Sequence, residues 1–297
     1  MEVILVPHTH WDREWYLPHA EFSLMLVKFI DRLLDILEIE PDFSCFMLDG
    51  QTIALEDYLS LKPEASPRIE QYVGQGRIII GPWYVLPDEV LVSGEAHIRN
   101  FLIGRSICQR YGGGMKTGYL PDSFGHPSQI PQILRGLGMD EMIFWRGLGP
   151  DITVSEFYWD GFDGTRILGL NMPLSYGVGA CLPRDIDEFV DRISKKLADL
   201  EPMSGTGVIL LMNGVDHVAP ERNLPDRIRR ANSQQDRFRL VLAPLSEYVD
   251  RVRRRIADVD LPVATGELRS GYRAYLLGGT VSTRMYLKQA NYHVEYL

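Results

Sequence analysis

Short apolar segments alternate with amphipathic segments along most of this 297-residue chain. Continuous apolar runs of four to eight residues are typical of buried strands, whereas apolar residues spaced three or four apart are typical of helices. Strands that alternate with helices run parallel to one another, because each helix carries the chain back to the same edge of the sheet. The pattern therefore predicts an α/β fold with a mainly parallel sheet, either closed or open.

The predicted elements follow one another at short intervals. The predicted strands cover 2–7, 43–48, 77–80, 117–120, 141–145 and 207–212, with a hairpin of 156–159 and 166–170 around Asp163 and Gly164. The predicted helices cover 21–37, 52–61, 67–75, 94–111, 128–137, 185–200 and 283–297. We expect one catalytic domain over residues 1–270, followed by a glycine-rich loop and a helix over 271–297. Two domains divided near Gly179 are the alternative.

Net charge, the length of apolar runs and the cysteine spacing indicate which partners and which cell compartment to expect. The net charge of −9 argues against nucleic acid or an anionic membrane surface as a partner, because both attract basic proteins. No apolar run approaches membrane-spanning length, and no secretory signal precedes the first strand. Cys45, Cys108 and Cys181 are widely spaced and odd in number, as is typical of reduced thiols. We expect a cytoplasmic protein, and the sequence leaves open whether it forms a homo-oligomer.

The first strand runs directly into a cluster of potential metal ligands. His8 and His10 are two residues apart, so their side chains point the same way in an extended segment, and Asp12 continues the row. Imidazole and carboxylate groups on one face suit a divalent metal such as zinc. The alternative is that the histidines cap the strand and Asp12 caps the next helix.

Every other predicted strand also ends in a polar or aromatic cluster, and parallel strands bring such ends to one face. The clusters contain Asp49, Trp83, Asp88, Asp122, Phe124, His126, Arg146, Asp216 and His217. Carboxylates and an arginine accompany aromatic rings there, and aromatic rings stack well on the apolar faces of sugars or bases. Neither a phosphate-binding glycine loop nor a GxSxG serine motif is present in the sequence.

Four of these segments resemble motifs of the family 38 glycoside hydrolases, the retaining α-mannosidases. Residues 7–15 (PHTHWDREW) resemble the opening metal motif, in a form closest to bacterial members. Residues 81–89 resemble the family's Gly-Trp strand end, residues 119–126 its nucleophile segment, and residues 213–217 its acid/base segment. The resemblance implies a mainly parallel, seven-stranded, barrel-like catalytic domain of the glycoside hydrolase/deacetylase type.

The resemblance also implies the catalytic and metal-binding residues. His10 and Asp12 would bind one divalent metal, usually zinc, with cobalt or calcium as alternatives. Asp122 would be both the third metal ligand and the nucleophile. Asp216 would be the general acid/base, although Asp49 and Asp88 are competing carboxylates.

Further positions carry supporting roles under the same resemblance. The substrate-binding residues would be Trp15, Trp83, Asp88, Phe124 and Arg146. His8 is expected to be structural or to support a ligand, and His126 and His217 either support neighbouring carboxylates or are structural.

The chain departs from the family in its length. Family members continue into a helical bundle, whose beginning supplies a second histidine ligand in a His-Asp segment, and His293 does not lie in such a segment. The resemblance therefore implies an N-terminal catalytic domain, cut at the start of the bundle, whose metal site is one ligand short. Whether such a fragment is active stays open.

Two other functions are compatible with the residues. A metal-dependent amidase or phosphoesterase would use the HxHxD motif to activate water, with His126 and His217 as further ligands. A carbohydrate-binding module without catalysis would use only the aromatic side chains. Within the mannosidase interpretation, the substrate could be an oligomannoside or a mannosylglycerate-type compound.

Overall fold

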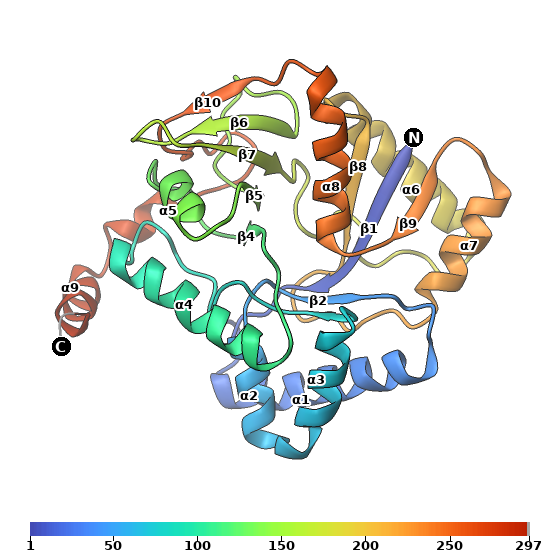
Figure 1. The fold of residues 1–297 in the computed structure, drawn as a ribbon, viewed down its shortest axis with the longest axis horizontal. Helices are drawn as coiled ribbons and strands as arrows, with labels where there is room; N and C mark the ends of the chain where they lie inside the picture. The colour runs from blue at the N-terminus through green and yellow to red at the C-terminus, as the bar shows by residue number, and fades with distance from the viewer. Residues whose placement is uncertain (296–297) are drawn as a thin grey trace.

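Strand β1 (Glu2–Thr9) lies at the centre of the first of two sheets in the computed structural model, which describes residues 1–295 (Figure 1). Its central side chains, Val3 to Val6, are fully buried. Strand β8 (Val208–Asn213) runs parallel to it, from the pair Glu2 and Val208 to the pair Pro7 and Asn213. The first strand is therefore a core element along its whole length.

The partner on the other side of β1 changes along the strand. The beginning of β1 pairs with β9 (Arg239–Leu242), and its end pairs with β2 (Phe46–Leu48). Strand β3 (Ile78–Ile79) follows β2, and all these pairings are parallel. The carboxyl ends of β1, β2, β3 and β8 consequently lie at one edge of the sheet.

The second sheet has the order β10-β6-β7-β5-β4. Its strands are β4 (Gly118–Leu120), β5 (Glu141–Phe144), β6 (Glu156–Asp160), β7 (Arg166–Asn171) and β10 (Val263–Thr265). Only the β6–β7 pair is antiparallel, and the predicted hairpin is thereby confirmed. In its turn, Asp163 accepts hydrogen bonds from the main chain and hydroxyl of Thr165.

Helices cover the outer faces of both sheets (Figure 1). The α-helices are α1 (His19–Ile39), α2 (Ile53–Leu61), α3 (Ser66–Gly74), α4 (Gly94–Arg110), α5 (Ile130–Gly136), α6 (Ile186–Leu200), α7 (Leu224–Gln234), α8 (Leu245–Arg255) and α9 (Met285–Val294). Four 3-10 helices are η1 (Pro63–Ala65), η2 (Glu201–Met203), η3 (Ile256–Asp258) and η4 (Gly278–Val281). Helix α9 projects from the edge of the molecule, and residues 296 and 297 of the predicted last helix lie outside the described residues.

The predicted α/β architecture with parallel sheets is confirmed, but a seven-stranded barrel is not. Within residues 1–295, the pairings fall into two sheets, and no ladder joins β3 to β4 or β7 to β8. Strands β3 and β4 have only two and three residues and so offer few groups for a second partner, whereas β7 and β8 have six residues each and are still not paired with one another. Residues on both sides of Gly179 contribute to the first sheet through β1 and β8. The domain boundary near residue 270 stays a prediction.

Helix α1 shows how apolar spacing selects a packing face. Phe22, Leu26, Ile30, Leu33 and Leu37 recur at helical spacing, and all of them are buried. They contribute to the largest apolar cluster of the protein, together with residues of α2, α3 and α6. No helix within residues 1–295 is both long enough and apolar enough to span a bilayer.

Leu33→Ala should lower the free energy of unfolding by about 2–5 kcal/mol, because it removes a fully buried side chain and leaves a cavity. Leu24→Ala is the matched control on the same helix, since Leu24 is 62% exposed and its loss should change stability by less than about 0.5 kcal/mol. Urea denaturation of both variants measures the difference. Equal losses would contradict the assigned packing face of α1.

Candidate functional site

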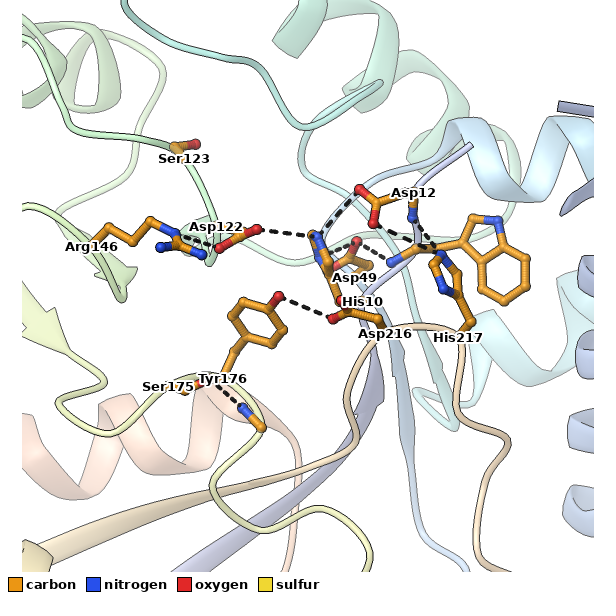
Figure 2. A network of polar contacts seen from close by, with 12 residues as sticks. His10, Asp12, Asp49, Asp122, Ser123, Arg146, Ser175, Tyr176, Asp216 and His217 are labelled. Carbon is orange, nitrogen blue, oxygen red and sulfur yellow. Dashed lines mark hydrogen bonds and ion pairs between the residues drawn. The ribbon is translucent and has the colours of Figure 1, made fainter. Parts of the chain in front are cut away.

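Acidic residues and histidines gather where four parallel strands end (Figure 2). His10 and Asp12 follow β1, Asp49 follows β2, Asp122 follows β4, and Asp216 follows β8. His10 and Asp216 form an isolated parallel bridge, in which the main-chain N–H of His217 donates to the His10 carbonyl at 3.0 Å. The strand ends predicted from sequence therefore meet at one place.

His10 is the centre of this cluster. Its ring is buried, and Nδ1 donates to the Asp49 carboxylate at 3.0 Å. Nε2 faces Asp12 Oδ1 at 3.6 Å and Asp122 Oδ2 at 4.0 Å. Burial alone lowers the pKa of His10, but the three surrounding carboxylates outweigh burial and raise the pKa to about 10. The site therefore attracts positive charge at the position of Nε2.

Asp49 holds His10 in this orientation. Its fully buried carboxylate also accepts hydrogen bonds from the Trp11 main chain at 2.8 Å and from Gln51 Nε2 at 2.9 Å. A carboxylate that already receives these bonds is fixed in place, and so is the imidazole bound to it. Asp49 therefore supports the histidine and is not a free carboxylate available for acid/base catalysis.

Asp122 lies between Arg146 and His10. Arg146 Nε donates to Asp122 Oδ1 at 2.6 Å, while Asp122 Oδ2 faces His10. Burial raises the pKa of Asp122 and the nearby charge of Asp216 adds to this, although His10 and Arg146 act in the opposite direction. The orientation of this carboxylate is set from both sides.

Arg146 is in turn held by its own contacts. Its Nη1 donates to the Tyr275 carbonyl at 2.7 Å. Its guanidinium group lies over the rings of Trp145 and Phe124, at 4.0 Å and 4.6 Å from their centroids. Phe124 and Arg146 thus lie beside Asp122, as the sequence predicts.

Asp216 lies in the same site and follows the carboxyl end of β8, the strand beside β1. Tyr176 donates its hydroxyl to Asp216 Oδ1 at 3.0 Å (Figure 2). Burial and the charges of Asp122 and Asp216 raise the pKa of Tyr176 far above its ordinary value, so the phenol stays a donor. Burial raises the pKa of both Asp12 and Asp122, and repulsion from Asp216 adds to this, so the three carboxylates share one electrostatic environment.

His217 and His8 have structural contacts. The Asp12 main chain donates to His217 Nε2 at 3.2 Å, and His217 Nδ1 lies 3.2 Å from the Tyr16 hydroxyl. Burial lowers the pKa of His217. His8 Nε2 lies 2.8 Å from the Tyr176 carbonyl and so fixes the segment that carries the Tyr176 ring. His217 therefore supports Asp12, and His8 supports Tyr176.

His126 has no contact with a carboxylate of the cluster. Its Nδ1 lies 2.7 Å from Glu89 Oε1 and its Nε2 lies 3.1 Å from the Arg146 carbonyl. Both ring nitrogens are therefore engaged. The alternative in which His126 and His217 supply further ligands to a water-activating metal finds no support in these contacts.

The structure argues against one of the predicted substrate-binding residues, Trp83, and leaves the role of Asp88 as a prediction. Trp83 is fully buried, and its indole N–H donates to the Tyr119 carbonyl at 3.0 Å, so its ring offers no surface to a sugar. Asp88 is exposed, and no polar contact joins its side chain to the cluster in the described part of the chain. Trp15, in contrast, is 74% exposed and can stack on a ligand.

Sequence reasoning missed Tyr176 and the supporting role of Asp49. Tyr176 lies in a loop after β7 without a motif of its own, so only the folded chain relates it to Asp216. Asp49 was visible as a strand end, but its pairing with His10 depends on the register between β1 and β2.

The donor set partly fits a metal ion. Asp49 occupies Nδ1 of His10 and leaves Nε2 facing two carboxylates, the arrangement that metal-binding histidines commonly have. Ligands of a tetrahedral zinc lie about 3.3–3.6 Å from one another, so Asp122 would have to approach by a few tenths of an ångström. Across residues 1–295, no group of three or more histidine, cysteine, aspartate or glutamate side chains is arranged closely enough to hold a metal ion as it stands.

Comparison with known proteins shows which protein family the chain resembles. The family model "Glycosyl hydrolases family 38 N-terminal domain" matches residues 1–267. The "Putative mannosylglycerate hydrolase" of Halalkalibacterium halodurans is 35% identical, over 97% of this chain and 34% of its own length. Human "Alpha-mannosidase 2C1" is 31% identical, over 54% of this chain and 16% of its own length.

Solved structures agree with these relatives. An alpha-mannosidase from Enterococcus faecalis superposes with a TM-score of 0.91 at 38% identity, over 97% of this chain and 33% of that one. A polysaccharide deacetylase from Mycobacterium smegmatis, at 13% identity and a TM-score of 0.57, shares the fold alone. The chain spans about a third of the length of these two bacterial relatives, from Halalkalibacterium halodurans and Enterococcus faecalis. It belongs to glycoside hydrolase family 38 and contains the family's N-terminal domain.

Proposed function

We propose that this domain carries the catalytic site of a metal-dependent glycosidase that cleaves α-mannosidic bonds with retention of configuration. One observation carries the proposal: Asp122 is oriented by Arg146 on one side and faces His10 on the other, while Asp216 approaches from a different strand end. Retaining hydrolysis requires two such carboxyl groups, one as nucleophile and one as acid/base, about 5–5.5 Å apart.

In the first step, Asp122 attacks the anomeric carbon of the mannose while Asp216 protonates the departing glycosidic oxygen. Arg146 keeps the Asp122 carboxylate pointed at the sugar through its Nε–H bond. The products of this step are the free leaving group and a mannosyl ester of Asp122.

In the second step, Asp216 acts as a base. It takes a proton from water, which attacks the anomeric carbon and releases Asp122 and mannose with the original configuration. Tyr176 donates to one oxygen of Asp216 and leaves the other free for the proton. The same residue can therefore serve as acid and then as base without losing its orientation.

His10, Asp12 and Asp122 are the residues that we propose for the metal, with zinc as the first choice and cobalt or calcium as alternatives. The proposal is supported by the orientation of His10 Nε2 and by the negative charge around it. When bound, the ion would supply electrostatic stabilisation and contacts for the 2- and 3-hydroxyls of mannose.

Substrate contacts are proposed for Trp15 and Phe124, whose aromatic faces can pack on the sugar ring. A mannosylglycerate-type compound is the favoured substrate, because the bacterial relative that matches nearly the whole chain carries that name. An oligomannoside is the second candidate. Residence in the cytoplasm also stays a proposal, supported by three cysteines that are free in the described structure.

Asp122→Asn should lower hydrolysis of a nitrophenyl α-mannoside by roughly 10³-fold or more, because an amide is a poor nucleophile, while binding of mannose persists. Asp160→Asn is the control, since Asp160 pairs with Arg166 on the surface hairpin. Proton NMR of the first product in the unchanged protein should show the α-anomer. The β-anomer, or full activity of the Asp122 variant, would contradict the mechanism.

His10→Ala with Asp12→Ala should remove the metal that co-purifies with the unchanged chain at neutral pH. The reason is that these side chains supply two of the three proposed ligands. Elemental analysis gives the metal content per chain, and His293→Ala is the control because His293 lies in α9, outside the cluster. Equal metal in all three proteins would place the ion elsewhere.

A further inference from the structure

Glu89 and His126 form a buried ion pair beside the site, and the proposed reaction makes no direct use of it. Glu89 Oε1 lies 2.7 Å from His126 Nδ1, and both side chains have no exposed surface. Taking two such polar groups out of water carries a large desolvation cost, and apolar side chains of similar volume are often at least as stabilising. The pair therefore needs a role other than stability.

The hydrogen-bond donors and acceptors around His126 show how the pair acts on Arg146. A carbonyl oxygen can only accept, so His126 Nε2 must donate its proton to the Arg146 carbonyl, 3.1 Å away. A second proton must lie between Nδ1 and Glu89 Oε1, because two acceptors would repel each other at 2.7 Å. Glu89 thus keeps the Nε2–H of His126 directed at Arg146.

The Arg146 carbonyl belongs to the residue that orients Asp122. Arg146 Nε donates to Asp122 Oδ1 at 2.6 Å. The chain around Arg146 is held on the other side as well, because Gly147 bridges Ser270 and Arg146 Nη1 donates to the Tyr275 carbonyl. Two hydrogen bonds therefore connect Glu89, through His126, to the main chain of Arg146, and a third connects the Arg146 side chain to the Asp122 carboxylate.

We propose that Glu89 and His126 are positioning residues for mannoside hydrolysis: they fix the main chain of Arg146 and, through its guanidinium group, the attacking carboxylate of Asp122. The assignment rests on the function proposed above, in which Asp122 is the nucleophile. It explains why a histidine occupies an apolar setting between the rings of Phe144 and Trp159. Glu89 Oε2 is buried without a hydrogen-bond partner in the described structure, which is a further cost of placing Glu89 here.

The decisive variant replaces the pair by apolar side chains of similar volume, Glu89→Met with His126→Phe. It leaves no unpaired charge, so the fold should persist while the Arg146 carbonyl loses its donor. His126→Asn is a second route, because its shorter amide can keep a bond to Glu89 but cannot reach Arg146. Glu89→Gln is the conservative variant, since its amide can donate to Nδ1 of a neutral His126 and preserve the Nε2–H.

Two measurements report on the variants. The first is hydrogen exchange of the Arg146 Nε–H proton by NMR, which needs no catalysis; loss of its positioning should speed exchange at least about tenfold. The second is hydrolysis of a nitrophenyl α-mannoside, where kcat should fall about 10–100-fold with a smaller change in KM. Glu89→Gln should restore both values toward those of the unchanged protein.

His97→Phe is the matched control. His97 is also buried and its Nε2 contacts the Glu89 carbonyl, but it has no contact with Arg146. It should change stability without changing Nε–H exchange or kcat. Unchanged exchange and kcat in both disrupting variants, or an equal effect of His97→Phe, would overturn the positioning role. No hydrolysis by the unchanged protein would contradict the proposed function alone, because the exchange measurement would still decide the inference.

Discussion

The parallel pairing of β1 with β8 and β2 is the constraint on which the site depends. It places the ends of three strands side by side, so that His10 meets Asp49 from one neighbour and Asp216 from the other. A shift of one residue in this register would turn His10 to the opposite face of the sheet. Such a shift would also exchange the side chains of Val3 and Leu5, which pack in one apolar cluster, with those of Ile4 and Val6, which pack in another. The close packing of both clusters opposes that exchange.

The site concentrates negative charge in a partly buried space. Asp12, Asp49 and Asp122 surround one imidazole, and burial together with repulsion from neighbouring carboxylates raises the pKa of Asp12 and of Asp122. Asp49 is satisfied by several donors and Asp122 by Arg146, whereas Asp12 has only weak contacts with His10 and His217. The unbalanced charge beside His10 Nε2 is the physical basis of the proposed metal site.

Much of the site could be predicted because its residues directly follow apolar strands. His10, Asp12, Asp122 and Asp216 were recognisable since parallel strands bring their carboxyl ends together. Trp83, in the segment after β3, was misjudged for the opposite reason. Residues 80–92 form no regular strand or helix, so no periodicity indicates which side chains face inwards. Trp83 and Glu89 are buried there, whereas Asp88, which lies between them in the sequence, is exposed.

The sequence by itself determined the α/β class, the order of the elements and the positions of the main carboxylates, because apolar periodicity and strand ends are local properties. Only the tertiary structure decided that the strands divide into two sheets, that Tyr176 donates to Asp216, and that Glu89 is connected to Asp122 through His126 and Arg146. These features join segments far apart in the chain. Their geometry follows from sheet register and loop conformation, which no local pattern encodes.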